Sequence, residues 1–66
     1  MDIELGEYKA VKDVAMRTGN SAWMLMDGGK MRVEQIDNAG KQALVRCESS
    51  IDWMHFGAIK KCFVKI

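Results

Sequence analysis

The chain has few of the residues that build metal sites. Its 66 residues contain one histidine, His55, and two cysteines, Cys47 and Cys62, which are too far apart to form a close-spaced pair. A structural zinc site takes four ligands, mostly cysteine and histidine, so two more ligands would be needed. We therefore expect no metal and no cofactor. We interpret the two cysteines as reduced thiols that behave as small buried hydrophobic side chains.

Long apolar runs and a strong net charge are also missing. No apolar segment approaches the roughly 18 residues of a membrane-spanning helix, and the acidic start at residues 1–4 differs from the basic leader of a signal peptide. The net charge of +1 provides no strong long-range attraction to nucleic acid or to anionic membranes. These features predict a cytoplasmic protein without a membrane partner.

The sequence shows no assembled catalytic set. His55 could serve as a general base only with a nucleophile or carboxylate in reach, and strand alternation places the nearby Asp52 on the opposite side. We therefore predict that the protein is not an enzyme.

The composition is that of one small folded domain spanning residues 1–66. Apolar residues make up 48% and charged residues 29% of the chain, which is ordinary for a globular protein. Proline is absent, so the turns are marked by glycine and by short polar clusters.

A β-hairpin is predicted over residues 31–47. Alternating segments at 31–36 and 42–47 flank the polar loop 37–41, in which Gly40 suits the left-handed position of a short hairpin connection. Ile36 breaks the alternation, which indicates a β-bulge near Glu34 and Gln35.

Two further elements are predicted after this hairpin. Residues 51–56 alternate again, with Trp53 and His55 on one side. Residues 57–61 suit a single helical turn, and residues 62–66 suit a last short strand.

The first half of the chain also reads as a succession of short strands and turns. An apolar strand at residues 8–14 precedes a polar turn at 17–20, a short strand at 23–26, a glycine turn at 27–30 and the alternating strand at 31–36. This order resembles the start of a Src-homology-3-like (SH3-like) barrel. The resemblance implies an all-β fold: a small five-stranded barrel with one short helical turn near the C-terminus.

The resemblance also bears on the ligand. Lys12, Val14, His55 and Ala58 stand where the family has the aromatic residues and the proline that line its peptide groove. Because polyproline helices dock into aromatic-lined grooves, we predict that this chain does not bind ordinary proline-rich peptides.

A second interpretation of residues 11–22 is the first helix and turn of a helix-turn-helix, because Tyr8, Val11, Val14 and Ala15 also fall at helical spacing. Its recognition helix would be largely apolar, whereas base edges are read through polar side chains.

Two functional hypotheses follow. In the first, the protein is a non-enzymatic protein-interaction module, such as a small regulator or inhibitor of a cellular protein. Its predicted partner-binding residues are Trp53, His55, Lys60 and Lys61, although the sequence leaves open whether Trp53 lies in the core or at a groove. In the second, nucleic acid binds to a basic face by phosphate contact and base stacking. That face would contain Lys30, Arg32, Lys41 and Arg46 together with Trp53, Lys60 and Lys61.

Overall fold

The computed structural model describes residues 3–18 and 20–66, which form mostly β-strands. The elements in chain order are β1 (Gly6–Ala10), β2 (Val14–Thr18), β3 (Ser21–Leu25), β4 (Lys30–Asp37), β5 (Gln42–Cys47), β6 (Ser50–His55), α1 (Phe56–Cys62) and β7 (Phe63–Lys65). The predicted all-β class with one short helix is therefore confirmed. None of the helical structure in the described residues is long and apolar enough to cross a membrane.

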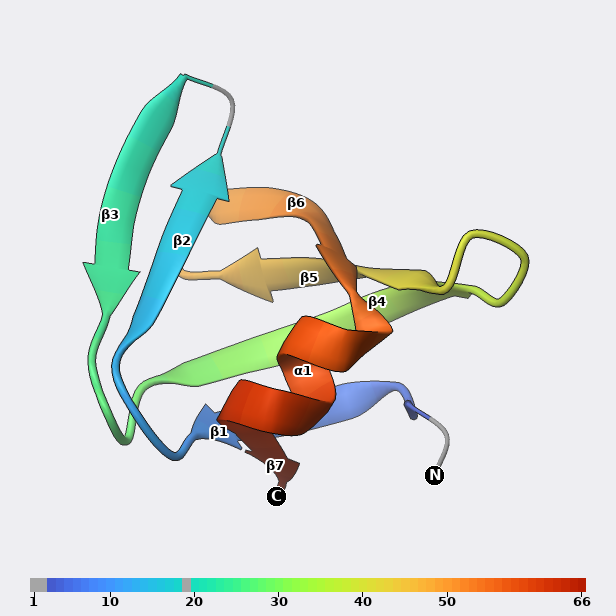
Figure 1. The fold of residues 1–66 in the computed structure, drawn as a ribbon, viewed down its shortest axis with the longest axis horizontal. Coiled ribbons are helices and arrows are strands. Elements are labelled where there is room, and N and C mark those ends of the chain that lie inside the picture. The colour runs from blue at the N-terminus through green and yellow to red at the C-terminus, as the bar shows by residue number, and fades with distance from the viewer. Residues whose placement is uncertain (1–2, 19) are drawn as a thin grey trace.

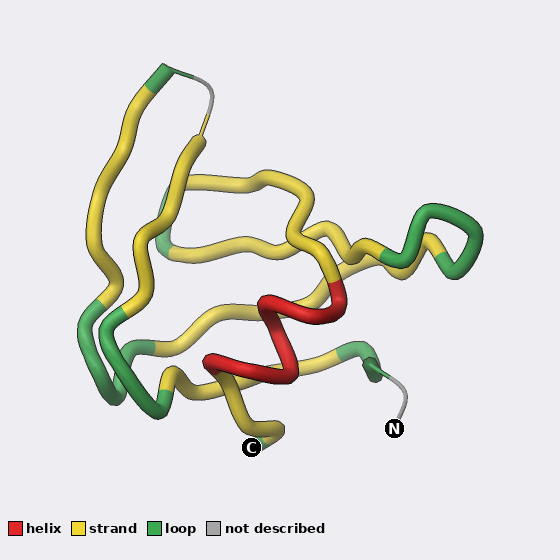
Figure 2. Tube along the Cα trace, viewed as in Figure 1, coloured by secondary structure: helices red, strands yellow, loops and turns green. Residues whose placement is uncertain are grey.

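The strands are divided between two sheets. Five of them form an antiparallel sheet in the order β6-β5-β4-β1-β7, and β2 and β3 form a separate two-stranded sheet (Figure 1). Within the described residues no ladder joins β6 to β7 or one sheet to the other, so the closed five-stranded barrel of the prediction is not found. Figure 2 shows the β2–β3 hairpin at one end of the larger sheet, with its tip directed away from β1 and β7.

The single strand predicted at residues 8–14 is instead two strands, β1 and β2. The backbone of Ala10 donates to Gly29 O at 2.8 Å and accepts from Gly28 N at 2.8 Å, and Val11 N donates to Cys62 O at 2.9 Å. These bonds to distant parts of the chain end the ladder of β1 at Ala10. Gly28 has φ +90°, a conformation that favours glycine. The turn whose backbone is hydrogen-bonded to Ala10 therefore depends on Gly28.

The β4–β5 hairpin forms where the sequence predicted it. Its register shifts between Val33 and Gln35, which confirms the bulge at Glu34. The left-handed residue, however, is Lys41 at φ 54° and not Gly40. Gly40 has another role: its N–H donates to the Asp37 carboxylate at 3.0 Å, and a Cβ atom there would lie 2.6 Å from the second carboxylate oxygen.

One face of the larger sheet carries the core, and α1 and the inner face of the β2–β3 hairpin pack onto it. The buried apolar side chains are Ile3, Tyr8, Ala10, Val14, Met16, Leu25, Met31, Val33, Ala43, Val45, Cys47, Ile59 and Phe63. In β4 and β5 they alternate with exposed or half-buried residues, as strand geometry requires. Cys62 is half-buried against this core, and both cysteines are free thiols.

The helix-turn-helix interpretation is wrong, because Val14–Thr18 and Ser21–Leu25 are strands. Val14 pairs with Leu25 and Met16 with Trp23, so the apolar residues follow a period of two across a hairpin. Gly19, part of the predicted polar turn, lies outside the described residues.

Candidate functional site

A groove of about 240 Å³ lies between the β2–β3 hairpin and β6, the edge strand of the larger sheet. We call it the hairpin groove. Its lining residues are Val14, Ala15, Met16, Arg17 and Trp23 from the hairpin, Val45, Cys47, Ser50, Asp52, Trp53, Met54 and His55 from β5 and β6, and Ala58 from α1. Most of these side chains are apolar, so the groove suits an apolar ligand with a few polar groups.

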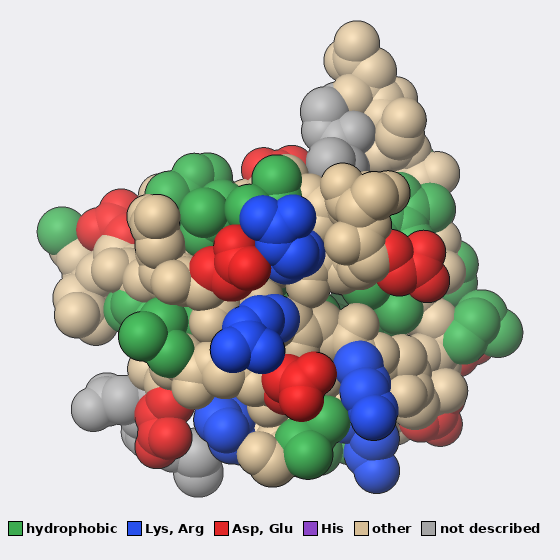
Figure 3. Space-filling model, turned by 180° about the vertical axis from the view of Figure 1, so that it is seen from behind, with side chains coloured by type: hydrophobic (Ala, Val, Ile, Leu, Met, Phe, Trp, Pro, Cys, Tyr) green, Lys and Arg blue, Asp and Glu red, His purple; other side chains and the backbone are tan. Residues whose placement is uncertain are grey.

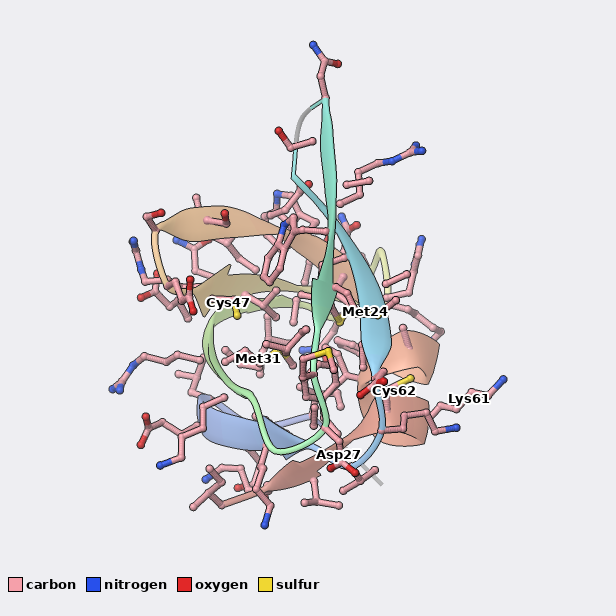
Figure 4. All side chains as sticks on the ribbon, turned by 90° about the vertical axis from the view of Figure 1, so that its left-hand side faces the viewer. Met24, Asp27, Met31, Cys47, Lys61 and Cys62 are labelled. Atoms are coloured by element: carbon pink, nitrogen blue, oxygen red, sulfur yellow. The ribbon has the colours of Figure 1, made fainter. Side chains whose placement is uncertain are left out.

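The hairpin wall follows from the alternation of β2 and β3. The cross-strand pair Met16 and Trp23 lies on the inner face, where Met16 is buried and Trp23 is half-buried against the core. Ala15 and Met24 form the next pair along, on the other face, and Met24 is exposed. Figure 4, viewed from the hairpin side, shows Met24 on the hairpin that stands in front of the larger sheet.

The opposite wall is formed by β6. Its inner residues Asp52 and Met54 lie beside Val45 and Ala43 of β5, and both are half-buried. The backbone N–H of Trp53 donates to Asp52 Oδ1 at 2.8 Å, which holds the carboxylate at the strand. Among the described residues the only strand partner of β6 is β5, so its other edge is unpaired, and β6 also contacts β2 of the hairpin.

Trp53 lies at the surface and not in the core. Its side chain is 44% exposed, and its cross-strand neighbour is Leu44, on the side of β5 opposite the buried Val45. This answers the question that the sequence left open. A partly exposed indole beside a groove combines a large apolar area with a polar N–H, which makes it a suitable anchor for a partner.

His55 lies where β6 meets α1. It pairs with Gln42 across the sheet, is exposed, and occupies the N-cap position without a side-chain capping bond. Together with Ala58 it lines the groove near the start of the helix.

The two predicted lysines do not join Trp53 and His55. Lys60 and Lys61 are in the last turn of α1, where Lys60 lines a second cavity, described below, and Lys61 lines neither cavity. Figure 4 shows Lys61 extending away from the molecule. Successive helical residues are separated by about 100°, so the side chain of Lys61 points in a different direction from that of Lys60.

Arg17 and Asp52 are groove residues that the sequence analysis did not select. Arg17 precedes the hairpin tip on β2 and is exposed, and Asp52 is half-buried on β6. The sequence did contain a signal for the hairpin. Val14 and Met16 are spaced two residues apart on β2, and so are their partners Leu25 and Trp23 on β3. Asp52 was rejected as a catalytic partner of His55 because the two side chains face opposite sides of the strand, but both residues line the groove at the edge strand.

Cys47 is an unreactive part of the groove. Its Sγ donates to Lys30 O at 3.4 Å, and burial, assisted by the charge of Glu48, raises the pKa of the thiol. The nucleophilic form of cysteine is the thiolate, so a raised pKa favours the inert neutral thiol.

Three of the cations considered for nucleic acid, Lys30, Arg32 and Arg46, lie on the outer face of the larger sheet, whereas Lys41 is in the β4–β5 loop and Lys60 and Lys61 are on α1. Arg46 Nε donates to Glu34 Oε2 at 2.9 Å, and this ion pair raises the pKa of Arg46. Arg32 lies opposite Glu7 in the register of β1 and β4. Figure 3 shows basic and acidic side chains alternating over this view of the molecule, which is typical of a solvated charged face.

Neither a protein-family model, nor a curated protein, nor a solved structure matches this chain.

Proposed function

We propose that this protein is a small non-enzymatic interaction module that binds a partner protein in the hairpin groove. The observation that carries the proposal is that Trp53, a half-exposed tryptophan of the edge strand β6, lines a mainly apolar groove. Binding energy at protein interfaces concentrates in a few anchors, and tryptophan is among the commonest of them. A regulator or inhibitor of a cellular protein is the class of function that such a module serves.

The proposed architecture is an open relative of the Src-homology-3-like barrel. The order of β1, the β2–β3 hairpin, the β4-β5-β6 meander, the short helix and β7 supports this assignment. In this arrangement the hairpin and β6 are the two walls that a ligand bridges.

The proposed ligand is an extended apolar segment of the partner rather than a polyproline helix. Val14, His55 and Ala58, three of the residues that replace the family's aromatics and proline, line the groove. Val14 and Ala58 leave an aliphatic surface, with the imidazole of His55 beside it, in place of the stacked slots that accept proline rings. The free edge of β6 adds backbone donors and acceptors for an extended chain.

A pull-down from cell lysate with three baits tests the proposal: the wild-type chain, Trp53→Ala and Ile51→Ala. Ile51 is a matched control, because it is an exposed apolar residue of the same strand at 39% exposure and does not line the groove. We expect Trp53→Ala to lose the captured protein, with a binding cost of at least about 2 kcal/mol for a central anchor. Ile51→Ala should retain it.

Equal retention by both variants would contradict the assignment of the groove. Captured complexes should also survive nuclease treatment and a rise in salt, because an apolar contact depends weakly on ionic strength. Binding that is lost with nuclease and falls steeply with salt would favour the nucleic-acid hypothesis instead.

A further inference from the structure

A second and larger cavity lies beside α1, away from the two tryptophans. Its volume is about 450 Å³, and Ile3, Tyr8, Ile59 and Phe63 form its apolar walls. The cavity lies where the N-terminal segment, β1, α1 and β7 come together, in the lower part of Figure 1. We call it the α1 cavity. It falls in the range of about 300–1,000 Å³ that is usual for small-molecule sites, whereas the hairpin groove is smaller.

The polar group of Tyr8 is already satisfied. Its hydroxyl donates to Glu4 O at 3.0 Å and accepts from Glu4 N at 2.8 Å. This reciprocal pair holds the N-terminal segment at the cavity. The tyrosine therefore presents an apolar ring rather than a free donor to a ligand.

The charged residues at the cavity give a net positive rim. Lys60 and Lys65 line it together with one acidic residue, Glu4. The ammonium of Lys65 lies 5.9 Å from the centre of the Tyr8 ring and donates to Ile66 O at 3.1 Å. Within residues 3–18 and 20–66, Lys60 has no ion pair and no side-chain hydrogen bond, so its ammonium is available to a ligand.

We propose that the α1 cavity binds a small amphiphilic anion, a short aliphatic chain that carries a carboxylate. The apolar walls take the chain, and Lys60 at the rim pairs with the carboxylate. The site is independent of the hairpin groove, because the two share no lining residue.

The position of Lys60 also has a purely structural explanation. Cations in the last turn of a helix interact favourably with its dipole, and both Lys60 and Lys61 are placed to do so. Lys61 is therefore a matched control. It shares the helix end and the charge of Lys60 but does not line the cavity.

The test is a titration of the ¹⁵N-labelled chain with octanoate below its micelle concentration, followed by nuclear magnetic resonance. We expect saturable shifts centred on the amides of Tyr8, Ile59 and Phe63, with small changes at Trp53. Lys60→Gln should weaken octanoate binding about three- to fivefold, the effect of losing an exposed ion pair, and Lys61→Gln should leave it unchanged. Octylammonium, which has the same chain and the opposite charge, should bind more weakly than octanoate.

Three results would overturn the proposal. The first is shifts that do not saturate or that spread over all exposed apolar residues. The second is equal weakening by the two lysine variants, which would assign the effect to the general charge of the helix end. The third is tighter binding of octylammonium, which would make Glu4 the governing charge.

Discussion

Replacement of Trp53 by alanine should destabilise the fold only modestly. A little more than half of the side chain is covered, since 44% is exposed. A fully buried aromatic covers about 150–250 Å², so Trp53 covers roughly 85–140 Å². At about 25 cal/mol per Å² this gives an upper bound of about 3.5 kcal/mol. Because the ring lies at the surface and leaves no enclosed cavity, we expect a loss of about 1–2 kcal/mol in the free energy of unfolding.

Urea unfolding followed by far-ultraviolet circular dichroism measures this loss without depending on the deleted indole. Ile59→Ala is the comparison, because Ile59 is fully buried at 0% exposure and its truncation should cost about 2–5 kcal/mol. The surface position of Trp53 is refuted if Trp53→Ala loses its cooperative transition, or costs as much stability as Ile59→Ala. Trp53 would then belong to the packing of the domain, and its role as a binding anchor would have to be abandoned.

Three further predictions concern the β4–β5 turn and the thiols. Gly40→Ala should destabilise the domain by about 1 kcal/mol, measured by urea unfolding, because the added Cβ meets the Asp37 carboxylate and disturbs its bond to the Gly40 N–H. The pKa of Asp37 is lowered, first by the Gly40 N–H and then by the Gln42 side chain. The stabilisation by the Asp37 carboxylate is therefore present above its ordinary pKa and is lost as the pH falls through its lowered pKa in the folded state. The difference in unfolding free energy between wild type and Asp37→Asn should shrink below about pH 4. A difference that stays constant with pH would contradict this. Iodoacetamide should modify the half-buried Cys62 before the buried Cys47, whose pKa is raised; mass spectrometry of peptides checks the order, and faster modification of Cys47 would refute it.

The parts of the fold that sequence alone could predict are those fixed by neighbouring residues. The β4–β5 hairpin follows from two alternating segments around a short polar loop, and the Glu34 bulge follows from the phase change before Ile36. Both depend on interactions within about fifteen residues, for which side-chain patterning is a sufficient guide.

The separation of β1 from β2 could not be predicted in this way. Residues 8–14 have no turn signal, and the bend after Ala10 depends on backbone bonds to Gly28, Gly29 and Cys62. Asp13 adds a further long-range bond by accepting from Asp27 N at 2.9 Å. These partners are brought together by the tertiary fold, so the local pattern of the strand carries no sign of them.

The division of the predicted site between two cavities follows from the way α1 joins its neighbours. His55 ends β6, Phe56 begins the helix, and Phe63 begins β7 directly after Cys62, so no loop separates the three elements. The direction of the strand therefore fixes the rotation of the helix about its axis. Ala58 then lines the hairpin groove, whereas the buried Ile59 and the exposed Lys60 line the α1 cavity. Consecutive residues of α1 thus serve two different cavities, and their closeness in sequence to Trp53 does not reveal this division.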